Sequence, residues 1–308
     1  ELMSKRSEFF SMTPIIPEPR GRVFFNKRLL EEAGIDPEEP YNLQKEGKWT
    51  WETFEDLVAK CTRDIDNDGI MDIWGMANSS TEFVPLAVMS NGTAMIGRDA
   101  NGKYINNIGT DKSLEALKWC AHMATNYEKP QPEGSEWNWM YPAFVNGEVA
   151  FQVDQEYHAQ PNGTYAQMKD DFGFVCFPLG PSGDGKYKTL HNDNLYVLPS
   201  CYDDEIAAKF VKAFDLWTEP VPGAETDENG EDLSWKEGYY TCFRDSRAVD
   251  ETLALMKENP NPRYDTLIPD INYMGDVIWV VYPGYVEPQQ AYEDTINTYK
   301  GLLDYANR

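Results

Sequence analysis

The first apolar segments of the chain predict a strand followed by two helices. Residues 23–25 are apolar throughout, which is typical of a buried strand, and Asn26 is suited to cap a helix that ends near Gly34. Thr50 offers a second N-cap, because apolar residues recur behind it at helical spacing as far as Cys61. Thr53 stands where a capping box usually has Glu or Gln.

The remaining pattern alternates strands with helices. Residues 111–127 predict a helix behind an Asp111 cap, and the acidic segment 219–231 is interpreted as a surface loop. This alternation favours an α/β fold with a largely parallel sheet. The same criteria predict strands over 149–153, 172–177 and 196–198, a helix from Asp203 or Asp204 to Trp217, and a helix from Pro288 with Tyr292, Ile296, Tyr299 and Leu302 on one stripe.

Composition excludes several partners. The 27 basic and 52 acidic residues leave a formal charge of −25, which repels phosphate backbones and anionic lipids. Nucleic acid is therefore not an expected partner. No stretch approaches the roughly 20 consecutive apolar residues that cross a bilayer. No leader precedes Glu1, so we expect any export signal to have been removed.

The sequence lacks the motifs that identify common classes of enzyme. The five cysteines form no CxxC pair and are expected to be mostly free, buried thiols, and the three histidines are too dispersed for a metal centre. The motifs HExxH, GxxxxGK[ST], GxSxG and GxGxxG are absent. An enzyme whose carboxylates come from distant loops remains compatible with the sequence.

An acidic loop has the spacing of a calcium site. The loop begins at Asp64. Counted from this residue, carboxylates occupy positions 1, 3, 5 and 9 around a glycine at position 6, as in an EF-hand loop, and the backbone carbonyl at position 7 completes the pattern. Position 12 is Gly75 rather than the usual glutamate. We expect a structural calcium ion here, and the alternative is a solvated acidic turn. The predicted ligands are Asp64, Asp66, Asp68, Ile70 and Asp72.

Four segments in order resemble one family. The sequence FFNKRLL at 24–30, followed by Ala33 and Gly34, resembles the YYNKDLFEKAG signature of the family-1 extracellular solute-binding proteins, to which maltose-binding protein belongs. WTWETF at 49–54 is similar to its TWDEF, and AFVNGEVAF at 143–151 is similar to its AFxxGxxAM. The Pro288 helix resembles its closing PxxAxxxA helix.

The resemblance implies an α/β fold of the type II periplasmic-binding-protein kind, with two lobes, a hinge and a cleft between the lobes. In this family the YNK segment opens the second lobe, whereas only 22 residues precede Val23, so the first lobe is expected to be incomplete in this chain. The implied divisions are 1–22 as a remnant of the first lobe, 23–190 as the second lobe, 191–255 as a segment returning to the first lobe, and 256–308 as closing helices on the second lobe.

The function that the resemblance implies is capture without catalysis. The expected ligand is a carbohydrate, most simply an oligosaccharide, and the expected partners are the permease subunits of an ABC transporter. The protein would act as a monomer outside a bacterial cell, tethered to the surface or in the periplasm. Two other classes stay open: a glycoside-active enzyme with paired carboxylates, and a surface carbohydrate-binding module without a transporter.

The resemblance also indicates candidate ligand contacts. Tyr157 stands where the family tends to place a sugar-stacking tryptophan, and Asp154 and His158 could bond to hydroxyls. Trp137, Trp139 and Tyr141 would point the same way if the chain were extended. Each ring could instead pack in the core. The further candidates are Tyr273, Asp276 and Trp279 near the closing helices, and Asn91 and Asn194, which could equally be turn formers.

Overall fold

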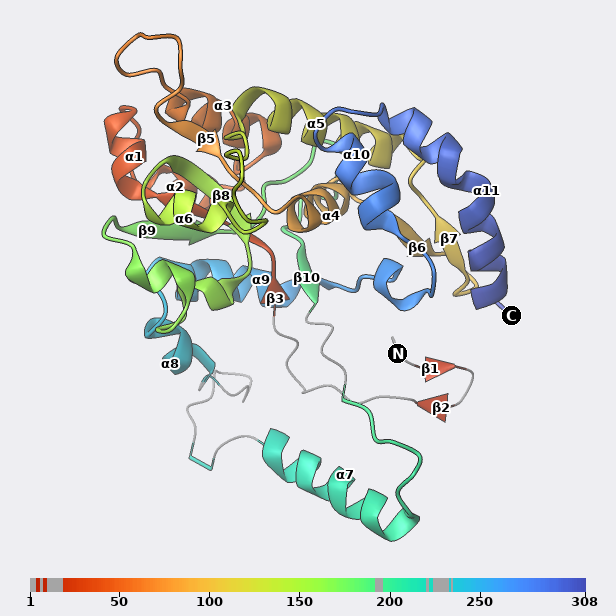
Figure 1. Cartoon of the computed structure of the whole chain (residues 1–308). Helices are drawn as coiled ribbons and strands as arrows, with labels where there is room; N and C mark the ends of the chain where they lie inside the picture. Colours follow the sequence, from red (N-terminus) through yellow and green to blue (C-terminus); the bar gives the residue numbers. More distant parts are fainter. Residues whose placement is uncertain are drawn as a thin grey trace.

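A four-stranded sheet lies at the centre of the molecule. The computed structural model describes residues 19–191, 196–219 and 235–308, together with 4–5, 8–9, 222–223 and 233. The sheet has the order β5-β8-β4-β9 and is surrounded by helices (Figure 1). Its strands are β4 (Arg22–Asn26), β5 (Trp74–Met76), β8 (Val149–Asp154) and β9 (Phe172–Val175).

The direction of the strands differs from the prediction. β4 runs antiparallel to both of its neighbours, β8 and β9, and β5 is parallel to β8. The expectation of a largely parallel sheet is therefore wrong for this sheet. An alternation of strands and helices along the chain does not determine the relative direction of neighbouring strands, and both neighbours of β4 run in the direction opposite to it.

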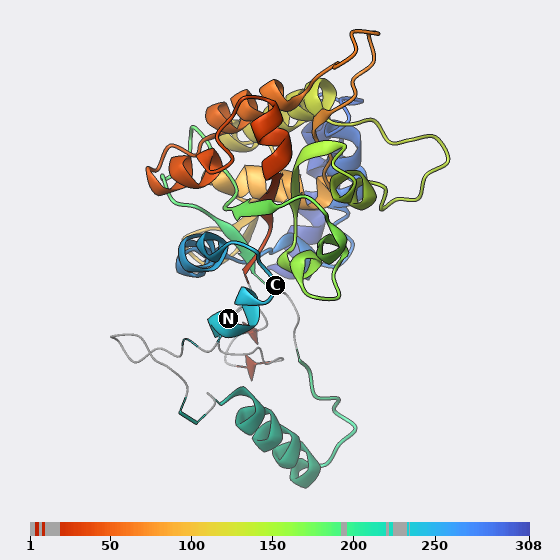
Figure 2. The same cartoon turned by 90° about the vertical axis from the view of Figure 1, so that its left-hand side faces the viewer.

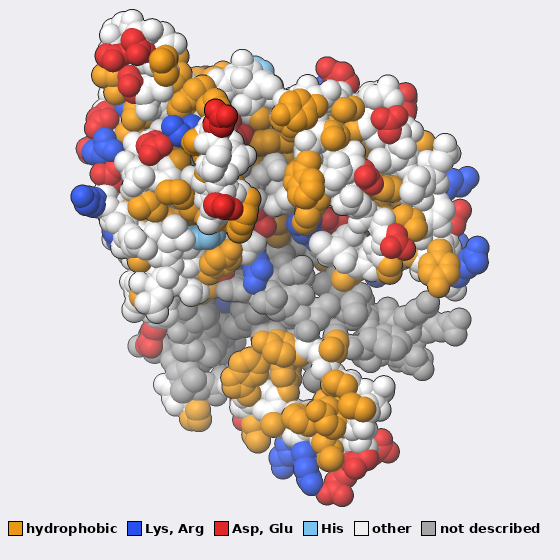
Figure 3. Space-filling model, viewed as in Figure 1, with side chains coloured by type: hydrophobic (Ala, Val, Ile, Leu, Met, Phe, Trp, Pro, Cys, Tyr) orange, Lys and Arg blue, Asp and Glu red, His pale blue; other side chains and the backbone are white. Residues whose placement is uncertain are grey.

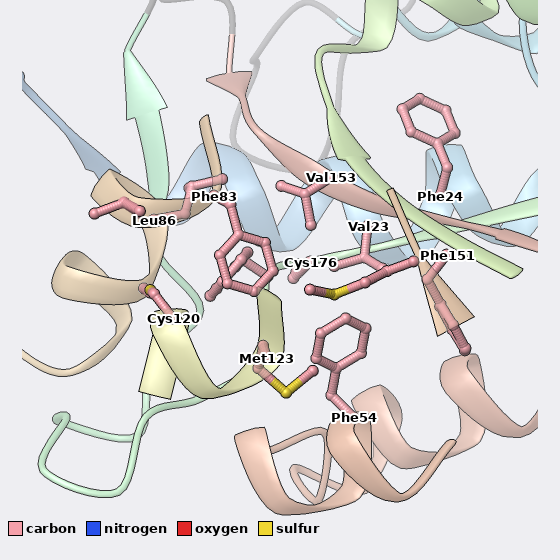
Figure 4. Close-up of a cluster of buried hydrophobic side chains, with 14 of the residues drawn as sticks. Val23, Phe24, Phe54, Phe83, Leu86, Cys120, Met123, Phe151, Val153 and Cys176 are labelled. Carbon is pink, nitrogen blue, oxygen red and sulfur yellow. The ribbon is translucent and has the colours of Figure 1, made fainter. Parts of the chain in front are cut away.

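Helices cover both faces of β4, which explains its unbroken apolar run. On one face Phe25 packs against Tyr41 of α2 (Glu39–Lys45), with ring centroids 5.3 Å apart. On the other face Phe24 contacts Phe144 of α6 (Met140–Val145), at 6.5 Å. Figure 4 shows Phe24 pointing to the opposite side of the strand from Val23.

Two predicted helices begin at their predicted caps. The Asn26 side chain accepts from the Leu29 amide at the start of α1 (Lys27–Glu32). At α3 (Trp51–Cys61) Thr50 and Thr53 form a reciprocal capping box, in which the Thr53 hydroxyl replaces the usual carboxylate. Both predictions are confirmed.

Two other helices need small corrections. The cap of α5 (Asp111–Tyr127) is Thr110 rather than Asp111, because the Thr110 hydroxyl accepts from the Ser113 amide. The buried stripe of α11 (Pro288–Ala306) includes Ala291, Thr295, Tyr299 and Leu303. The predicted stripe shares only Tyr299 with it, because Tyr292, Ile296 and Leu302 are only partly buried.

The chain between β9 and α7 was predicted less well. The predicted strand over 196–198 is wrong, since only Tyr196 forms an isolated bridge there and the strand of this region is β10 (Thr189–His191). α7 (Asp204–Thr218) begins after its Asp203 cap as predicted, and it buries none of its residues. Both views place this helix away from the sheet (Figures 1 and 2). Most of the predicted 219–231 loop lies outside the described residues.

The other described elements lie outside the central sheet. No described helix is long and apolar enough to cross a membrane. All five cysteines are free, and Cys61, Cys120 and Cys176 are buried. The other elements are β1 (Ser4–Lys5), β2 (Glu8–Phe9), β3 (Pro19–Arg20), α4 (Ser80–Ser90), β6 (Ile96–Arg98), β7 (Tyr104–Asn106), η1 (Glu156–Ala159), η2 (Thr164–Gln167), α8 (Trp235–Tyr240), η3 (Ala248–Leu253), α9 (Ala254–Glu258), β11 (Pro260–Asn261), η4 (Asp265–Leu267), η5 (Met274–Ile278) and α10 (Trp279–Val281).

Candidate ligand-binding site

A cavity of about 1030 Å³ lies between the connection from α5 to α6 and the segment around α10. Hydrophobic side chains gather on both sides of a hollowed strip on this face (Figure 3). The volume is at the upper end of the range of about 300–1,000 Å³ that is typical of small-molecule sites. The aromatic lining residues are Trp74, Trp137, Trp139, Trp279, Tyr282 and Tyr285.

Several of these rings face solvent. The exposed fractions are 72% for Trp137, 57% for Trp279 and 81% for Tyr285. Trp279 is the first residue of α10, and Trp137 lies in the turn before α6. Exposed rings around a cavity are suited to binding a flat apolar face, because they lose little conformational freedom when a ligand covers them.

A carboxyl group forms part of the polar lining of the cavity. Glu128 Oε1 accepts from the Asn78 amide at 2.8 Å, and the Glu128 carboxylate also bonds to the Tyr282 hydroxyl. Burial raises the pKa of Glu128 to about 7, although these two hydrogen bonds act in the opposite direction. The cavity therefore contains an acid that changes charge near neutral pH.

A second group of candidate residues lies at the end of β8. Asp154 is the last residue of the strand and is buried, and η1 then presents Tyr157, which is 43% exposed. His158 is buried between Tyr157 and Tyr141, with ring centroids 4.3 and 4.4 Å away. Its Nε2 lies 3.3 Å from Asp154 Oδ1. The predicted grouping of Asp154, Tyr157 and His158 is thus present at one strand end.

Acceptor oxygens are concentrated beside Tyr157. Glu82 Oε1 accepts from the Gln155 side chain at 2.7 Å, but Glu82 Oε2 and Gln155 Oε1 have no hydrogen-bond partner among the described residues. Burial raises the pKa of Glu82, and the nearby Asp154 charge adds to the increase. Buried acceptors without donors are costly, so this end of the site is suited to a ligand that supplies hydrogen-bond donors.

The structure brings some of the sequence candidates together. Trp139 and Trp279 line the same cavity, although one precedes α6 and the other begins α10. Tyr157, His158 and Asp154 are not among the residues that line this cavity. Trp137 and Tyr141 contact each other edge to face at 6.3 Å, but through a helical turn rather than the extended chain that was expected.

The other candidates have internal partners. Tyr273 is buried against Tyr299, and Asp276 accepts a hydrogen bond from the Tyr299 hydroxyl at 3.0 Å. Asn91 is fully buried, and its side-chain amide bridges the end of α4 to Lys112 and Glu115 of α5 and to the Ser182 amide, so it has a structural role. Asn194 lies outside the described residues.

Sequence reasoning missed most of the lining, including Glu128, Tyr285 and Trp74. These three residues belong to no motif that the sequence analysis identified. They share a cavity because β5, the end of α5 and the segment after α10 meet there. The one signal available was the density of aromatic residues, which does not separate core from surface.

The acidic loop projects between α3 and β5 (Figure 1). Carboxylate oxygens of Asp64, Asp66 and Asp72 lie within 4.8 Å of one another. Asp64 Oδ1 has no hydrogen-bond partner within the part of the chain that the structure describes. Asp68 Oδ1 accepts from the Ile70 amide at 2.7 Å, and Asp68 is not part of the converging group. Three of the four predicted carboxylates therefore lie close together, and each also accepts a hydrogen bond from a backbone amide of the loop.

Comparisons with known proteins identify the family. The family model of the bacterial extracellular solute-binding proteins matches residues 15–214, and the chain belongs to this family. No curated protein matches the chain at a significant level. The resemblance to family-1 solute-binding proteins is confirmed, and so is the function class, since members of this family bind solutes.

Solved structures show the same fold. An ABC substrate-binding protein from Listeria monocytogenes in complex with cycloalternan has a TM-score of 0.64 and 18% identity, over 97% of this chain and 74% of that chain. UgpB from Mycobacterium tuberculosis in complex with glycerophosphocholine has a TM-score of 0.68 and 13% identity, over 99% of this chain and 73% of that chain. The maltose/maltodextrin-binding domain MalE from Bdellovibrio bacteriovorus bound to maltotriose has a TM-score of 0.63 and 17% identity, over 98% of this chain and 76% of that chain. The predicted α/β solute-binding-protein fold is confirmed.

Proposed function

We propose that this protein captures a carbohydrate and delivers it to an ABC-type importer. The observation that carries the proposal is the aromatic cavity, because Trp139 and Trp279 both line it and were selected from the sequence as sugar contacts. Sugar rings present apolar faces that stack on aromatic rings and hydroxyl edges that need polar partners. Asn78, Ser80 and Thr81 supply polar groups around the same cavity.

The charge of the cavity favours a neutral ligand. The charged residues in its lining are Glu128 and Lys129, and Lys129 is paired with Glu148 at 3.2 Å. A phosphate or carboxylate ligand would need free cations, preferably arginine, in the wall. The structures bound to cycloalternan and maltotriose support a carbohydrate, and the one bound to glycerophosphocholine marks the charged alternative.

Membership of the family supports the rest of the function. We place the protein outside the bacterial cytoplasm, in the periplasm or tethered to the cell surface as a lipoprotein, with ABC permease subunits as its partners. It acts as a monomer and binds its ligand without chemical turnover. Incubation with oligosaccharides followed by chromatography tests this last point, because the appearance of products would favour the glycoside-active alternative.

Trp279 provides a direct test of the sugar site. Neutral gluco-, manno-, galacto- and xylo-oligosaccharides are screened by thermal shift, since a ligand of the folded state raises the melting temperature. For a glycan that binds, Trp279→Ala should weaken affinity by about 1 to 3 kcal/mol, the contribution of burying a large apolar side chain. Isothermal titration calorimetry measures this loss.

A matched variant controls for the loss of an exposed tryptophan. Trp217 lies on α7, is 64% exposed and does not line the cavity, so Trp217→Ala should bind like the wild type. Equal sugar affinity of the Trp279→Ala and Trp217→Ala variants would show that Trp279 does not contact the ligand. Failure of every neutral glycan to bind the wild type would contradict the proposed function itself.

We also propose a structural calcium ion in the acidic loop. The support is the convergence of Asp64, Asp66 and Asp72 within 4.8 Å and the unpartnered Asp64 Oδ1. Calcium prefers six to eight oxygen ligands, so the Asp68 carboxylate, the Ile70 carbonyl and water would complete the shell. The ion would fix the connection between α3 and β5, since these carboxylates repel one another without it.

The calcium proposal predicts a gain in thermal stability. Calcium should raise the melting temperature, because binding to the folded loop alone favours the native state, and Asp66→Ala should abolish the rise. Asp304→Ala, which removes the same charge from the exposed face of α11, should retain it. An identical melt in calcium and in chelator would rule out the site.

A further inference from the structure

The chain enters α10 through a turn that is wider than an α turn. The Trp279 backbone amide donates to the carbonyl of Met274, five residues earlier, which makes η5 a π turn. Such turns occur mostly singly and often at functional sites. Since each residue of an α-helix turns the chain by about 100°, the extra residue rotates the Trp279 side chain by about this angle relative to the segment before η5.

The direction of the Trp279 side chain matters because its neighbours in sequence point elsewhere. Val277 and Ile278 are both fully buried, whereas Trp279 is 57% exposed and lines the aromatic cavity. Val281, two positions further on, is buried again. A change in the spacing of the turn would therefore turn the Trp279 ring away from the cavity or displace a side chain that is now buried.

A hydrogen bond from α11 holds this turn. Tyr299 is buried on α11, which packs against η5 and α10 (Figure 1), and its hydroxyl donates to Asp276 Oδ2 at 3.0 Å. Asp276 lies within the loop that the bond between Trp279 and Met274 closes. Burial and the Asp276 charge raise the pKa of Tyr299, so its hydroxyl remains protonated and available as a donor.

The start of η5 is fixed by contacts of another kind. The Asn272 carbonyl accepts from the Asp276 amide at 2.9 Å, and the buried Tyr273 ring packs edge to face against the Tyr299 ring at 5.3 Å. These contacts use backbone groups and the Tyr299 ring rather than its hydroxyl. Tyr299→Phe should therefore keep them and remove only the hydrogen bond to the Asp276 carboxylate.

We propose that Asp276 and Tyr299 are positioning residues for ligand binding, because their hydrogen bond holds η5 in the spacing that presents the Trp279 ring to the cavity. Neither residue is among those that line the cavity, so both act through Trp279. The effect on binding rests on the proposed carbohydrate-binding function. Asp276, which the sequence suggested as a direct sugar contact, thus acts indirectly.

The first test is a double-mutant cycle on the affinity for a glycan that gives a thermal shift with the wild type. Tyr299→Phe should weaken binding by about threefold to tenfold, the equivalent of one net hydrogen bond. In the Trp279→Ala background the same change should have no effect, because the ring through which it acts is absent. Asp276→Ala should reproduce the loss, and Asp276→Asn, which keeps an acceptor oxygen, should restore most of the affinity.

A second measurement, without ligand, follows the Trp279 ring itself. In protein labelled with fluorotryptophan, the fluorine NMR resonance that disappears in Trp279→Phe belongs to this residue. It should shift in Tyr299→Phe, whereas the resonance of Trp217 on α7 should not. The control is Tyr292→Phe, which removes a hydroxyl from the same helix, where the ring lies against Gly109. This variant should leave both the Trp279 resonance and the affinity unchanged.

The outcomes separate the positioning role from the proposed function. Wild-type affinity of Tyr299→Phe would overturn the positioning role while leaving carbohydrate capture intact. An equal loss in the presence and absence of the Trp279 ring would also overturn it, because Tyr299 would then act by another route. If no glycan binds the wild type, the proposed function fails, and an unshifted Trp279 resonance would then overturn the positioning of the ring as well.

Discussion

Glu128 is a carboxyl group held between a backbone amide and a phenol. Asn78 donates its amide to Oε1 at 2.8 Å, and the Tyr282 hydroxyl, itself buried, bonds to the same carboxylate. Burial nevertheless dominates and raises its pKa to about 7 from the usual 4.5. A pKa that is higher in the folded than in the unfolded state makes folding take up a proton.

The sign of this effect gives a prediction for stability. The favourable contribution of protonated Glu128 is complete below pH 4.5 and is lost as pH rises through about 7. Glu128→Gln is neutral throughout, so its unfolding free energy should exceed that of the wild type increasingly between pH 5 and 8. The difference should reach on the order of 1 to 3 kcal/mol, since one pKa unit corresponds to about 1.4 kcal/mol.

Urea denaturation at several pH values measures this difference. Glu136→Gln changes an exposed glutamate in the same connection between α5 and α6 and should follow the wild-type pH dependence. Parallel curves for Glu128→Gln and the wild type would show that Glu128 does not titrate in this range.

At the scale of single elements, α3 shows what local sequence can specify. Its capping box satisfies the Thr53 amide and the Thr50 amide reciprocally, and the helix then buries Phe54, Val58 and Cys61 in the core. Both features depend on residues within one segment, so they could be read from the sequence. The same holds for the Asn26 cap of α1.

The capping box predicts the cost of removing it. Thr50→Ala should lower the unfolding free energy by about 0.5 to 2 kcal/mol, because the Thr53 amide loses its acceptor. Thr50→Ser keeps the hydroxyl and should restore most of the loss. Urea denaturation gives both values, and a wild-type midpoint for the alanine variant would mean that another group or water caps the helix equally well.

α7 shows where local patterns stop being informative. The helix and its Asp203 cap were predicted correctly, yet Phe210 and Trp217 are exposed and the helix contacts the rings of Tyr196 and Tyr202. A hydrophobic stripe specifies that a face can be buried, but not what covers it. Strand direction has the same limitation, which is why the antiparallel pairing of β4 was missed.

At the scale of the whole molecule, the candidate site combines segments that local patterns treat separately. Trp139 was selected from a row of aromatic residues and Trp279 through a family resemblance, whereas Glu128 and Tyr285 became visible only when the folded chain placed them around one cavity. Conversely, Asn91 had a plausible sequence context but is saturated by internal hydrogen bonds. Burial and partners depend on tertiary contacts, so a sequence motif alone cannot distinguish a ligand contact from a structural residue.

The pairing of β4 also sets the order in which the molecule can form. Arg22 pairs with Asp154 and Val23 with Val175, so the first strand of the central sheet has no neighbour until the chain has been made as far as these residues. Helices α1 to α3 would have no completed sheet on which to pack during that interval. Such sequence-distant pairing is typical of slowly folding proteins, because long loops must close before any contact compensates for the lost entropy. Until residues 154 and 175 have been synthesised, the Arg22–Asn26 strand therefore lacks the partners that its backbone groups require.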